Sequence, residues 1–490
     1  MLKQYLLSIS LLSLLTCSAI ADDMSDDLSG FGDEEVLVED DSDLAGFSDS
    51  EDELSGFSEE DISQEPLHVE EEESMFTLSG DLAFKTSAGY KSHRVKAYKT
   101  DTKGIDYSGI NQAQTSLYLQ LDAKLSDDWK MRISGDAYYD AIYDINSHND
   151  YNQDTKDEYR TQLRFDDVYL QGRLNRDLDV KVGRQIVVWG KSDSIRITDV
   201  INPLDNRLPG MTDIKDLRLS TGMAKLDYYK GDWNYSFMAI AESRIMLESP
   251  ARSEFFPVDN IFPVAPEPFL ELKDTATSWD NMQYALAANG IFSGWDLSFY
   301  AADVLDQKWH IDRSSNPPTR RVSKVKMLGS AVNIVIGSWL IKSEVAFLNG
   351  IKYNSTDDEK NRLDALVGVD YMGITDTVLS LELANRHIFN HEDQMGEDIA
   401  MPDYVDKNEV QTALRITRSF LNDKINANAL LSMFGADWQY GGFGRVWVDY
   451  ELGNALNLSV GVVDYIDGDR PFMKALSNND RVFLDITYSF

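Results

Sequence analysis

Apolar and polar side chains alternate along most of the chain after about residue 75. In the segment TSLYLQLDAKLS, for example, Leu117, Leu119 and Leu121 are separated by Tyr118 and Gln120. A period of two residues is typical of β-strands that have one apolar and one polar face. We therefore predict an all-β fold. The eighteen predicted strands are near 76–90, 112–125, 129–143, 161–174, 178–190, 217–229, 233–246, 279–291, 295–305, 321–336, 339–349, 361–373, 376–388, 408–419, 424–435, 441–452, 455–465 and 480–490.

The lengths of the connections distinguish a membrane barrel from a soluble β-sandwich, whose strands alternate in the same way. Tight turns and long polar loops follow one another along this chain, and outer-membrane barrels have short periplasmic turns and long external loops. A closed barrel also satisfies every backbone group in lipid without leaving an edge strand. The sequence thus predicts a transmembrane antiparallel outer-membrane β-barrel of about eighteen strands over residues 76–490, surrounded by outer-membrane lipids. The tight turns include 126–128, 175–177 and 230–232, and the long loops include 144–160, 191–216, 247–278 and 389–407.

Both ends of the chain favour export to a Gram-negative outer membrane. Residues 1–21 contain Lys3, an apolar stretch and a small-x-small sequence ending at Ala21, so we predict a signal peptide that is cleaved after Ala21. A membrane anchor would need a longer apolar run, and Cys17, the only cysteine, fits a lipoprotein signal poorly. At the other end the alternation runs through Tyr488 to the terminal Phe490, a pattern that resembles the last strand recognised by the barrel-insertion machinery.

Four tryptophans provide an independent indication of a membrane. Each directly follows a tight turn, so all four are expected at one depth of the barrel. Trp prefers the headgroup layer, where its ring is partly in lipid and its N–H stays hydrated. We predict that they form a membrane girdle, composed of Trp129, Trp233, Trp295 and Trp339.

Residues 22–75 carry most of the acidity of the chain. They contain 23 Asp and Glu and no Lys or Arg; the net charge of the full chain is −37, and without these acids and Lys3 it is −15. Such a segment cannot bury enough apolar surface to fold alone. We therefore predict a disordered acidic tail in the periplasm.

Three Leu-Ser/Ala-Gly-Phe motifs interrupt this acidic tail. Each is a compact apolar hook, and three weak hooks on one tether raise the overall affinity for a partner. The surrounding acid favours a basic partner surface, so we expect the tail to bind a periplasmic or inner-membrane transport partner. A solubilising spacer is the alternative. The motif residues are Leu28, Gly30, Phe31, Leu44, Gly46, Phe47, Leu54, Gly56 and Phe57.

One predicted strand conflicts with simple alternation. In the segment LDVKVGRQ, counting from Val180 and Val182 places Arg184 toward lipid. An arginine facing lipid at the middle of the bilayer costs about 2–4 kcal/mol. We therefore predict a bulge at Gly183 that turns Arg184 into the lumen.

The segment that follows this strand carries a family resemblance. Its Gly-Arg-Gln, Trp-Gly and Ile-Asn-Pro-x-Asp elements resemble a family of outer-membrane barrels known as a domain of unknown function. Genes of that family often neighbour RND-superfamily transporters of the lipid-exporting MMPL type, so the resemblance implies an export partner and a lipid-like cargo. The matching positions are Gly183, Arg184, Gln185, Trp189, Gly190, Ile201, Asn202, Pro203 and Asp205.

The same segment forms the third long loop and is dense in charges of both signs. A proline-fixed corner and paired charges favour an ordered loop. We consider two alternatives: the loop folds against the inner wall and narrows the pore, or it is an ordered external loop with no part in gating. The pore or constriction candidates are Arg184, Lys191, Asp193, Arg196, Asp199, Asn202, Asp205 and Arg207.

Signatures of enzymes are weak in this sequence. His387, His391 and Glu392 could hold a metal, but a solvated loop is the simpler interpretation, and the sequence gives no reason to expect catalytic residues, a cofactor or nucleic-acid binding. We expect a transport protein, and three roles stay open. They are the outer-membrane conduit of an RND-family export system recruited through the tail, a general diffusion porin with a spacer tail, and a surface receptor or adhesin.

Overall fold

The computed structural model of the protein describes residues 74–490 apart from 147–148, 274, 397–401 and 454. The predicted signal peptide and the three motifs of the acidic tail lie outside the described residues.

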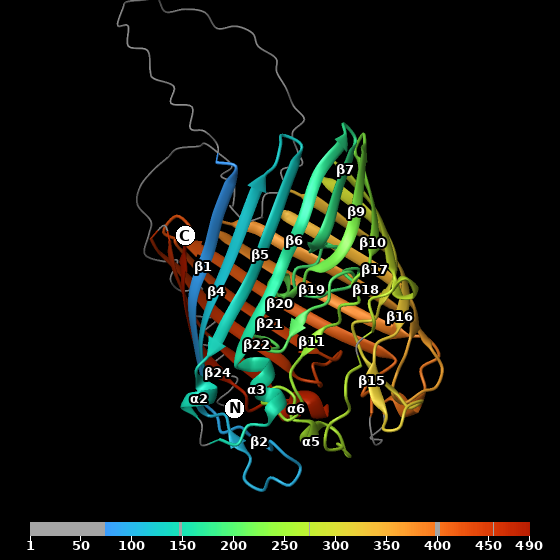
Figure 1. Ribbon diagram of the computed structural model, residues 1–490. Coiled ribbons are helices and arrows are strands. Elements are labelled where there is room, and N and C mark those ends of the chain that lie inside the picture. The colour runs from blue at the N-terminus through green and yellow to red at the C-terminus, as the bar shows by residue number, and fades with distance from the viewer. Residues whose placement is uncertain (1–73, 147–148, 274, 397–401, 454) are drawn as a thin grey trace, which may run out of the picture. The chain divides into compact units, whose positions relative to one another are not determined.

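Eighteen strands form one closed antiparallel barrel (Figure 1). Each strand pairs with the barrel strands before and after it in the chain. The first strand, β1, closes the ring by pairing with both β4 and β24. The predicted fold class and strand number are confirmed. The barrel strands are β1 (Phe76–Gly89), β4 (Gly109–Lys124), β5 (Trp129–Asp140), β6 (Thr161–Asn175), β7 (Leu178–Gln185), β9 (Thr221–Lys230), β10 (Trp233–Ile240), β12 (Gln283–Phe292), β13 (Trp295–Leu305), β16 (Lys324–Ile336), β17 (Trp339–Ile351), β18 (Lys360–Ile374), β19 (Thr377–Ile388), β20 (Asn408–Phe420), β21 (Ile425–Phe434), β22 (Gly442–Gly453), β23 (Leu456–Ile466) and β24 (Arg481–Ser489).

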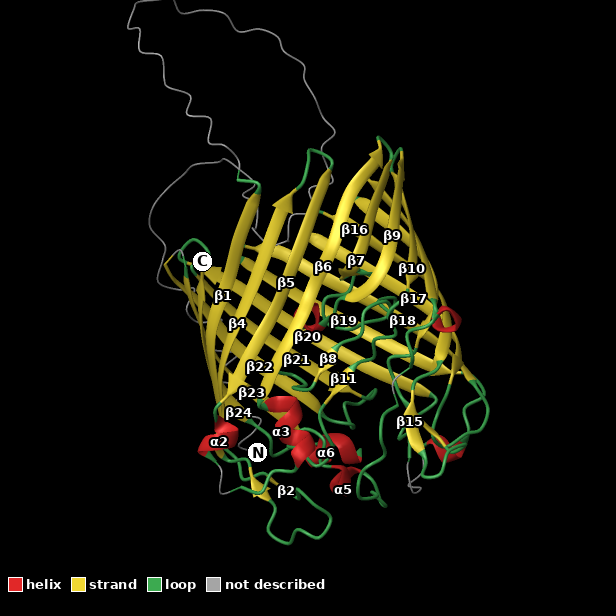
Figure 2. Ribbon diagram, viewed as in Figure 1, coloured by secondary structure: helices red, strands yellow, loops and turns green. Residues whose placement is uncertain are grey.

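Short helices and strand pairs cover the end of the barrel opposite the tight turns (Figure 2). Among the described residues, none of the helices is long and apolar enough to cross a membrane. The helices are α2 (Ile142–Ile145), α3 (Gln153–Tyr159), α4 (Ile214–Leu217), α5 (Val258–Ile261), α6 (Pro471–Leu476), η2 (Trp279–Asn281) and η3 (Asp393–Met395), and the short strands are β2 (Arg94–Val95), β3 (Ile105–Asp106), β8 (Asp205–Asn206), β11 (Leu247–Glu248), β14 (His310–Asp312) and β15 (Thr319–Arg321).

The barrel wall is apolar outside, and its inward face carries charged and polar side chains beside apolar ones. In β17, Trp339, Ile341 and Phe347 are 37–47% exposed, whereas the intervening Lys342 and Glu344 are only 2–3% exposed. The same alternation recurs around the barrel, because successive side chains of a strand point to opposite faces. An apolar outer band around a closed barrel is the surface that lipid contact requires.

The four predicted girdle tryptophans are the first residues of β5, β10, β13 and β17. They therefore lie at the tight-turn end of the barrel. Trp295 stacks on Phe292 with ring centroids 4.4 Å apart, and Trp339 lies 4.4 Å from Tyr371. These neighbours form an aromatic cluster at that end, and the depth of the cluster in a bilayer stays a prediction.

The last strand ends in two half-exposed aromatic rings. Tyr488 and Phe490 stack with centroids 6.3 Å apart. The backbone of Phe490 exchanges two 2.9 Å hydrogen bonds with Gly80 of β1, which completes the closure of the barrel. Recognition of these rings by the insertion machinery stays a prediction.

The barrel wall is shorter along the strand direction at β7, β9 and β10. These strands have 8, 10 and 8 residues, against 15 in β6. As a result, β6 pairs with β7 only from Val168 onward, and residues 161–165 pair with β5 alone. At about 3.3 Å per residue, the step in the wall is about 23 Å along the strand. The strands predicted at 178–190, 217–229, 233–246 and 279–291 extend beyond the observed β7, β9, β10 and β12 at this place.

Candidate functional site

The long segment between β7 and β9 lies inside the barrel. We call residues 186–220 the lumen loop. Its buried Val187, Ile195 and Ile197 belong to one apolar cluster with inward-facing residues such as Met238 of β10 and Met327 of β16. The loop therefore follows the inner wall, as the first of the two sequence-based alternatives expected.

Glu344 of β17 holds the first turn of the lumen loop. Its Oε1 accepts hydrogen bonds from the backbone N–H groups of Lys191 (2.6 Å) and Ser192 (2.8 Å). Its Oε2 accepts from the backbone N–H (3.1 Å) and the hydroxyl (2.7 Å) of Thr198. Glu344 is 2% exposed, so four donors of the loop satisfy a carboxylate that has almost no access to water.

Glu382 of β19 holds the adjacent backbone in the same way. It accepts hydrogen bonds from the backbone N–H groups of Asp193 (2.8 Å) and Ser194 (3.1 Å) and from the hydroxyl of Ser192 (2.9 Å). Lys342 forms ion pairs with Asp193 and with Asp370, the latter at 2.7 Å. Two inward carboxylates and one lysine of the wall thus fix residues 191–198 of the loop.

Asn202 ties the two ends of the lumen loop together. Its Oδ1 accepts from Val187 N–H at 2.8 Å, and its Nδ2 donates to the carbonyl oxygens of Gln185 (3.2 Å) and Leu219 (2.8 Å). Both Asn202 and Gln185 are fully buried. The Asn202 amide therefore forms hydrogen bonds with backbone groups at the point where β7 ends and β9 begins.

Trp189 and Gly190 fit the loop against the wall. The Trp189 ring stacks on Tyr300 of β13 with centroids 4.6 Å apart. Gly190 has φ +91°, and a Cβ at this position would lie 2.8 Å from the Glu344 carboxylate. Only glycine allows both this backbone conformation and this approach.

The predicted bulge at Gly183 is wrong. β7 pairs in regular register with β6 and β9 through Gly183 and Arg184. Gly183 nevertheless has φ +131°, and a Cβ there would lie 2.1 Å from the Val168 carbonyl oxygen. The bulge lies instead on β6, near the level where its pairing with β7 ends, where the β5–β6 register shifts between Ile133 and Gly135.

Arg184 consequently faces outward and is not a pore residue. Its guanidinium donates to Glu242 at 2.5 and 3.1 Å and to the Phe165 carbonyl oxygen at 3.3 Å. Arg184 is the seventh residue of β7, where the wall steps down, and its pairing with the Glu242 carboxylate reduces the cost of an outward-facing charge. An ion pair at the end of the strand takes the place of the expected inward turn.

The remaining constriction candidates divide between the two sides of the lumen loop. Lys191 pairs with Asp296 of β13 at 2.7 Å. Arg196 and Arg218 both bind Asp199, at 3.1 and 2.9 Å.

Asp205 and Arg207 lie on the other side of the loop, against β6. Arg207 pairs with Asp205 at 2.6 Å, and Asp205 also accepts from Arg164 of β6 at 3.2 Å. The Arg207 guanidinium also donates to the side-chain oxygen of Gln162 of β6 at 2.6 Å. These contacts attach the second half of the loop to the strand that stands beside the step in the wall.

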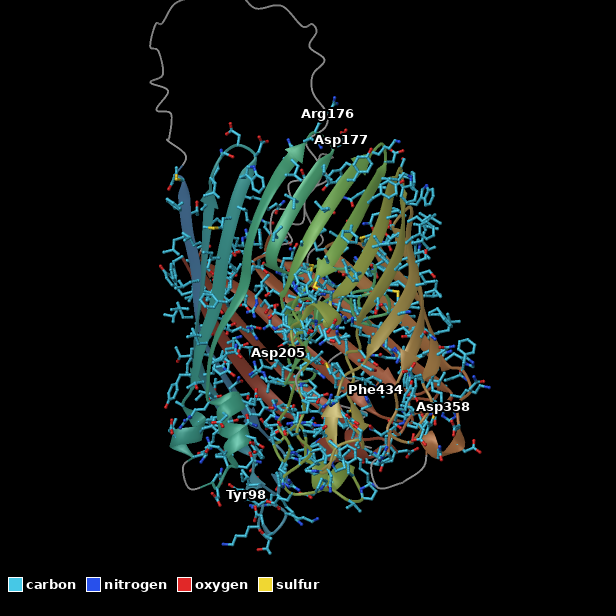
Figure 3. The ribbon with its side chains drawn as sticks, turned by 45° about the vertical axis from the view of Figure 1, so that its right-hand side comes forward. Tyr98, Arg176, Asp177, Asp205, Asp358 and Phe434 are labelled. Atoms are coloured by element: carbon cyan, nitrogen blue, oxygen red, sulfur yellow. The ribbon has the colours of Figure 1, made fainter. Side chains whose placement is uncertain are left out.

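Two cavities flank the lumen loop. The Asp205 cavity, about 460 Å³, lies between the loop and β1, β4, β5, β6 and β24. The Phe434 cavity, about 380 Å³, lies between the loop and β16 to β21. Figure 3 shows Asp205 and Phe434 in the interior, between the tight turn at Arg176 and the opposite end near Tyr98. Charged side chains of both signs line each cavity.

The outer loops pack over the lumen at the helical end. His93 is 5% exposed and its Nε2 lies 3.1 Å from the Glu254 carbonyl oxygen. Burial is the main cause that lowers the pKa of His93 below its ordinary value. Glu254 also pairs with Arg481 at 2.8 Å, so a buried ion pair joins loop 241–282 to the start of β24.

The sequence alone did not identify Glu344 and Glu382 as anchors of the loop. Their positions on inward faces were predictable, but about 150 and 190 residues separate them from their partners. The available signal was an acidic residue on the inward face of each strand, two residues before the buried Ala346 and Ala384.

Three comparisons relate this geometry to known proteins. A family model described as "Protein of unknown function (DUF1302)" matches residues 102–490. No curated protein matches the chain.

Several solved structures share the architecture. OccAB3 of Acinetobacter baumannii is 12% identical, with a TM-score of 0.47 over 85% of this chain and 99% of that chain. OpdK of Pseudomonas aeruginosa is 10% identical, with a TM-score of 0.46 over 84% and 99% of the two chains. A BenF-like porin from Pseudomonas fluorescens Pf-5 is 13% identical, with a TM-score of 0.46 over 84% and 98%. Identities this low concern the fold alone, which the strand pairing establishes independently.

Proposed function

Since the chain belongs to the DUF1302 family of proteins of unknown function, we propose from its own geometry that it is an outer-membrane channel narrowed by the lumen loop. The observation that carries this proposal is a closed barrel with an apolar outer face and charged side chains inside, in which the lumen loop is held by Glu344 and Glu382. A soluble protein would have no reason to expose an apolar band on every side of a closed sheet.

Solutes pass through the barrel beside the lumen loop. The Asp205 and Phe434 cavities lie on its two sides and both present charged side chains. Solutes that are small and at least partly polar fit such walls, because paired charges in a hydrated lumen can exchange partners with a solute. This supports a diffusion channel as the basic activity.

We further propose that the channel has a specific role in export. The barrel serves as the outer-membrane conduit of an RND-family system, and the acidic tail recruits the periplasmic or inner-membrane partner through its three Phe-containing motifs. This part rests on the composition of the tail and on the family resemblance, which also suggests a lipid-like cargo.

Planar-bilayer recordings test the channel. The purified full chain should give discrete conductance steps, and replacing residues 193–207 with a short Gly/Ser linker should raise the step size, because that segment occupies the lumen. Asp358, which is exposed in the loop between β17 and β18, provides a matched control: Asp358→Asn should leave the conductance unchanged. Absence of any conductance from correctly folded protein would overturn the proposal.

A pulldown tests the recruitment separately. Wild-type tail, residues 22–75, serves as bait after crosslinking in a periplasmic and inner-membrane extract. Changing Phe31, Phe47 and Phe57 to Ser should abolish capture of a transport partner. Equal capture by both baits would favour the spacer role and leave the channel itself untouched.

A further inference from the structure

The Phe434 cavity has apolar walls. Hydrophobic side chains of the lumen loop and of five barrel strands line most of it, and nearly all of these are less than 10% exposed. A cavity of about 380 Å³ is within the range of small-molecule sites, which are mostly apolar with a few placed polar groups. The apolar residues that line it include Ile197, Leu305, Val325, Leu348, Ile388 and Phe434.

The acidic side chains of this cavity already have basic partners. Asp364 accepts two 2.7 Å bonds from Arg362. Glu409 accepts two bonds, 2.6 and 2.7 Å, from Arg470, which lies outside the cavity. Asp199 is shared between Arg196 and Arg218, as described above. Among the described acidic residues that line the cavity, only Asp306, just after β13, forms no ion pair; its Oδ1 accepts a hydrogen bond from the backbone N–H of Lys308 at 3.0 Å.

Two basic side chains are less fully compensated. Arg386 lies 4.0 Å from Asp364 and otherwise donates to neutral oxygens, the Arg196 carbonyl at 3.3 Å and Gln411 at 3.2 Å. The side chain of Lys308 is exposed and lines the cavity. Among the described residues its ammonium group has no hydrogen-bond or ion-pair partner. Basic groups therefore outnumber free acidic groups at this end of the cavity.

An uncompensated acceptor lies next to Lys308. The side-chain oxygen of Gln307 is buried and has no hydrogen-bond partner among the described residues, and Gln307 lines the same cavity. A buried polar atom without a partner is unfavourable by about 1–3 kcal/mol. Because the side-chain amide can turn about its last bond, the same position can present its NH₂ donor to an anion in the cavity.

We infer that the Phe434 cavity binds amphipathic carboxylic acids, with the carboxylate between Lys308 and Arg386 and the apolar body against Ile388, Leu348 and Val325. An anion gains charge-assisted hydrogen bonds from groups that lack a full counter-charge, while its body replaces water on apolar walls. As the substrate class of the channel, this inference rests on the proposed function.

Calorimetric titration of the full chain in neutral detergent, with a detergent-only blank, tests this inference. The probe is 4-phenylbutyrate, compared with its neutral amide and with 4-phenylbutylamine. The acid should bind at least tenfold more tightly than the amide, and the amine should bind most weakly. Equal affinity for acid and amide would overturn the inference.

Substitution of Lys308 provides a second test of the binding site. Lys308→Met should weaken acid binding about tenfold, to the level of the amide, and should leave amide binding unchanged. Lys308→Arg should retain most of the affinity. Lys352→Met is the matched control, because Lys352 is an exposed lysine outside the cavity whose nearest carboxylate, Glu359, is 3.8 Å away. Full acid binding by Lys308→Met would refute the site.

Conductance of the same preparations separates the two proposals. A protein that conducts but does not discriminate acid from amide keeps the channel function and loses the substrate class. A protein that binds the acid but does not conduct keeps the site and loses the channel.

Discussion

Replacing Glu344 with glutamine should release the lumen loop from the wall. The carboxylate accepts two hydrogen bonds on each oxygen, and a glutamine can offer only one acceptor oxygen. In the better orientation the new NH₂ group faces Thr198, whose hydroxyl turns to accept, while the backbone N–H of Thr198 has no partner. The bonds from Lys191 and Ser192 lose their charge assistance.

These losses can be converted into a population. One unpaired buried N–H costs about 1–3 kcal/mol, and weakening of the other bonds adds about 1 kcal/mol. The free energy that holds the loop against the wall therefore falls by roughly 2–4 kcal/mol. At about 1.4 kcal/mol per tenfold, the ratio of released loop to wall-bound loop rises roughly 30- to 700-fold.

Labelling of a buried cysteine measures this ratio. Ile195 is 2% exposed in the lumen loop, and Cys17 is the only native cysteine. Ile195→Cys should react slowly with a charged maleimide in the wild-type background and much faster in the Glu344→Gln background. Asp358→Asn is the control with the same loss of charge, and it should not change the rate. Equal rates in all three backgrounds would show that Glu344 does not hold the loop.

Three further outcomes follow from the structure. Gly183→Ala should destabilise the barrel by about 1–3 kcal/mol or more, because the φ of +131° is strained for alanine and its Cβ meets the Val168 carbonyl; loss of the heat-resistant band on electrophoresis checks this. A double-mutant cycle of Arg184→Ala and Glu242→Ala should give a coupling of about 0.5–3 kcal/mol in chemical unfolding, whereas additive effects would argue against the ion pair. The pKa of His93 is lowered in the folded state, so the folded loops disfavour its protonation and lose stability as pH falls below about 6.5; protease cleavage of the outer loops should rise between pH 7 and pH 5 in the wild type but not in His93→Gln.

The sequence was sufficient for the barrel because its signal is local. In the last strand, for instance, every second residue from Val482 to Phe490 is apolar and faces outward, and neighbouring strands repeat the pattern. Tight turns fix which strands are neighbours, so the order of the ring followed without any long-range information.

The ends of β7 and β10 were not predictable in this way. After Gln185 the alternation continues, with Ile186 and Val188 exposed and Val187 buried, although the segment no longer pairs with the wall. The residue that diverts the chain is Asn202, whose amide competes for the backbone groups that a neighbouring strand would use. Alternation shows which face of a segment is buried. It does not show whether that face packs against a neighbouring strand or against the inside of the barrel.

The contacts of the lumen loop also bear on how a solute would pass. Glu344 and Glu382 together accept seven hydrogen bonds from the loop, and Asn202 adds three that join its ends. At about 1 kcal/mol or more for each bond, displacement of the whole loop would be rare even on the timescale of many passages. A channel that opened by ejecting this loop would need a partner that supplies most of that free energy. The cavities on both sides of the loop require no such step, because they are already present while the loop is bound to the wall. The loop is therefore best understood as a fixed divider of the lumen, and the selectivity of the channel should reside in the side chains that face it.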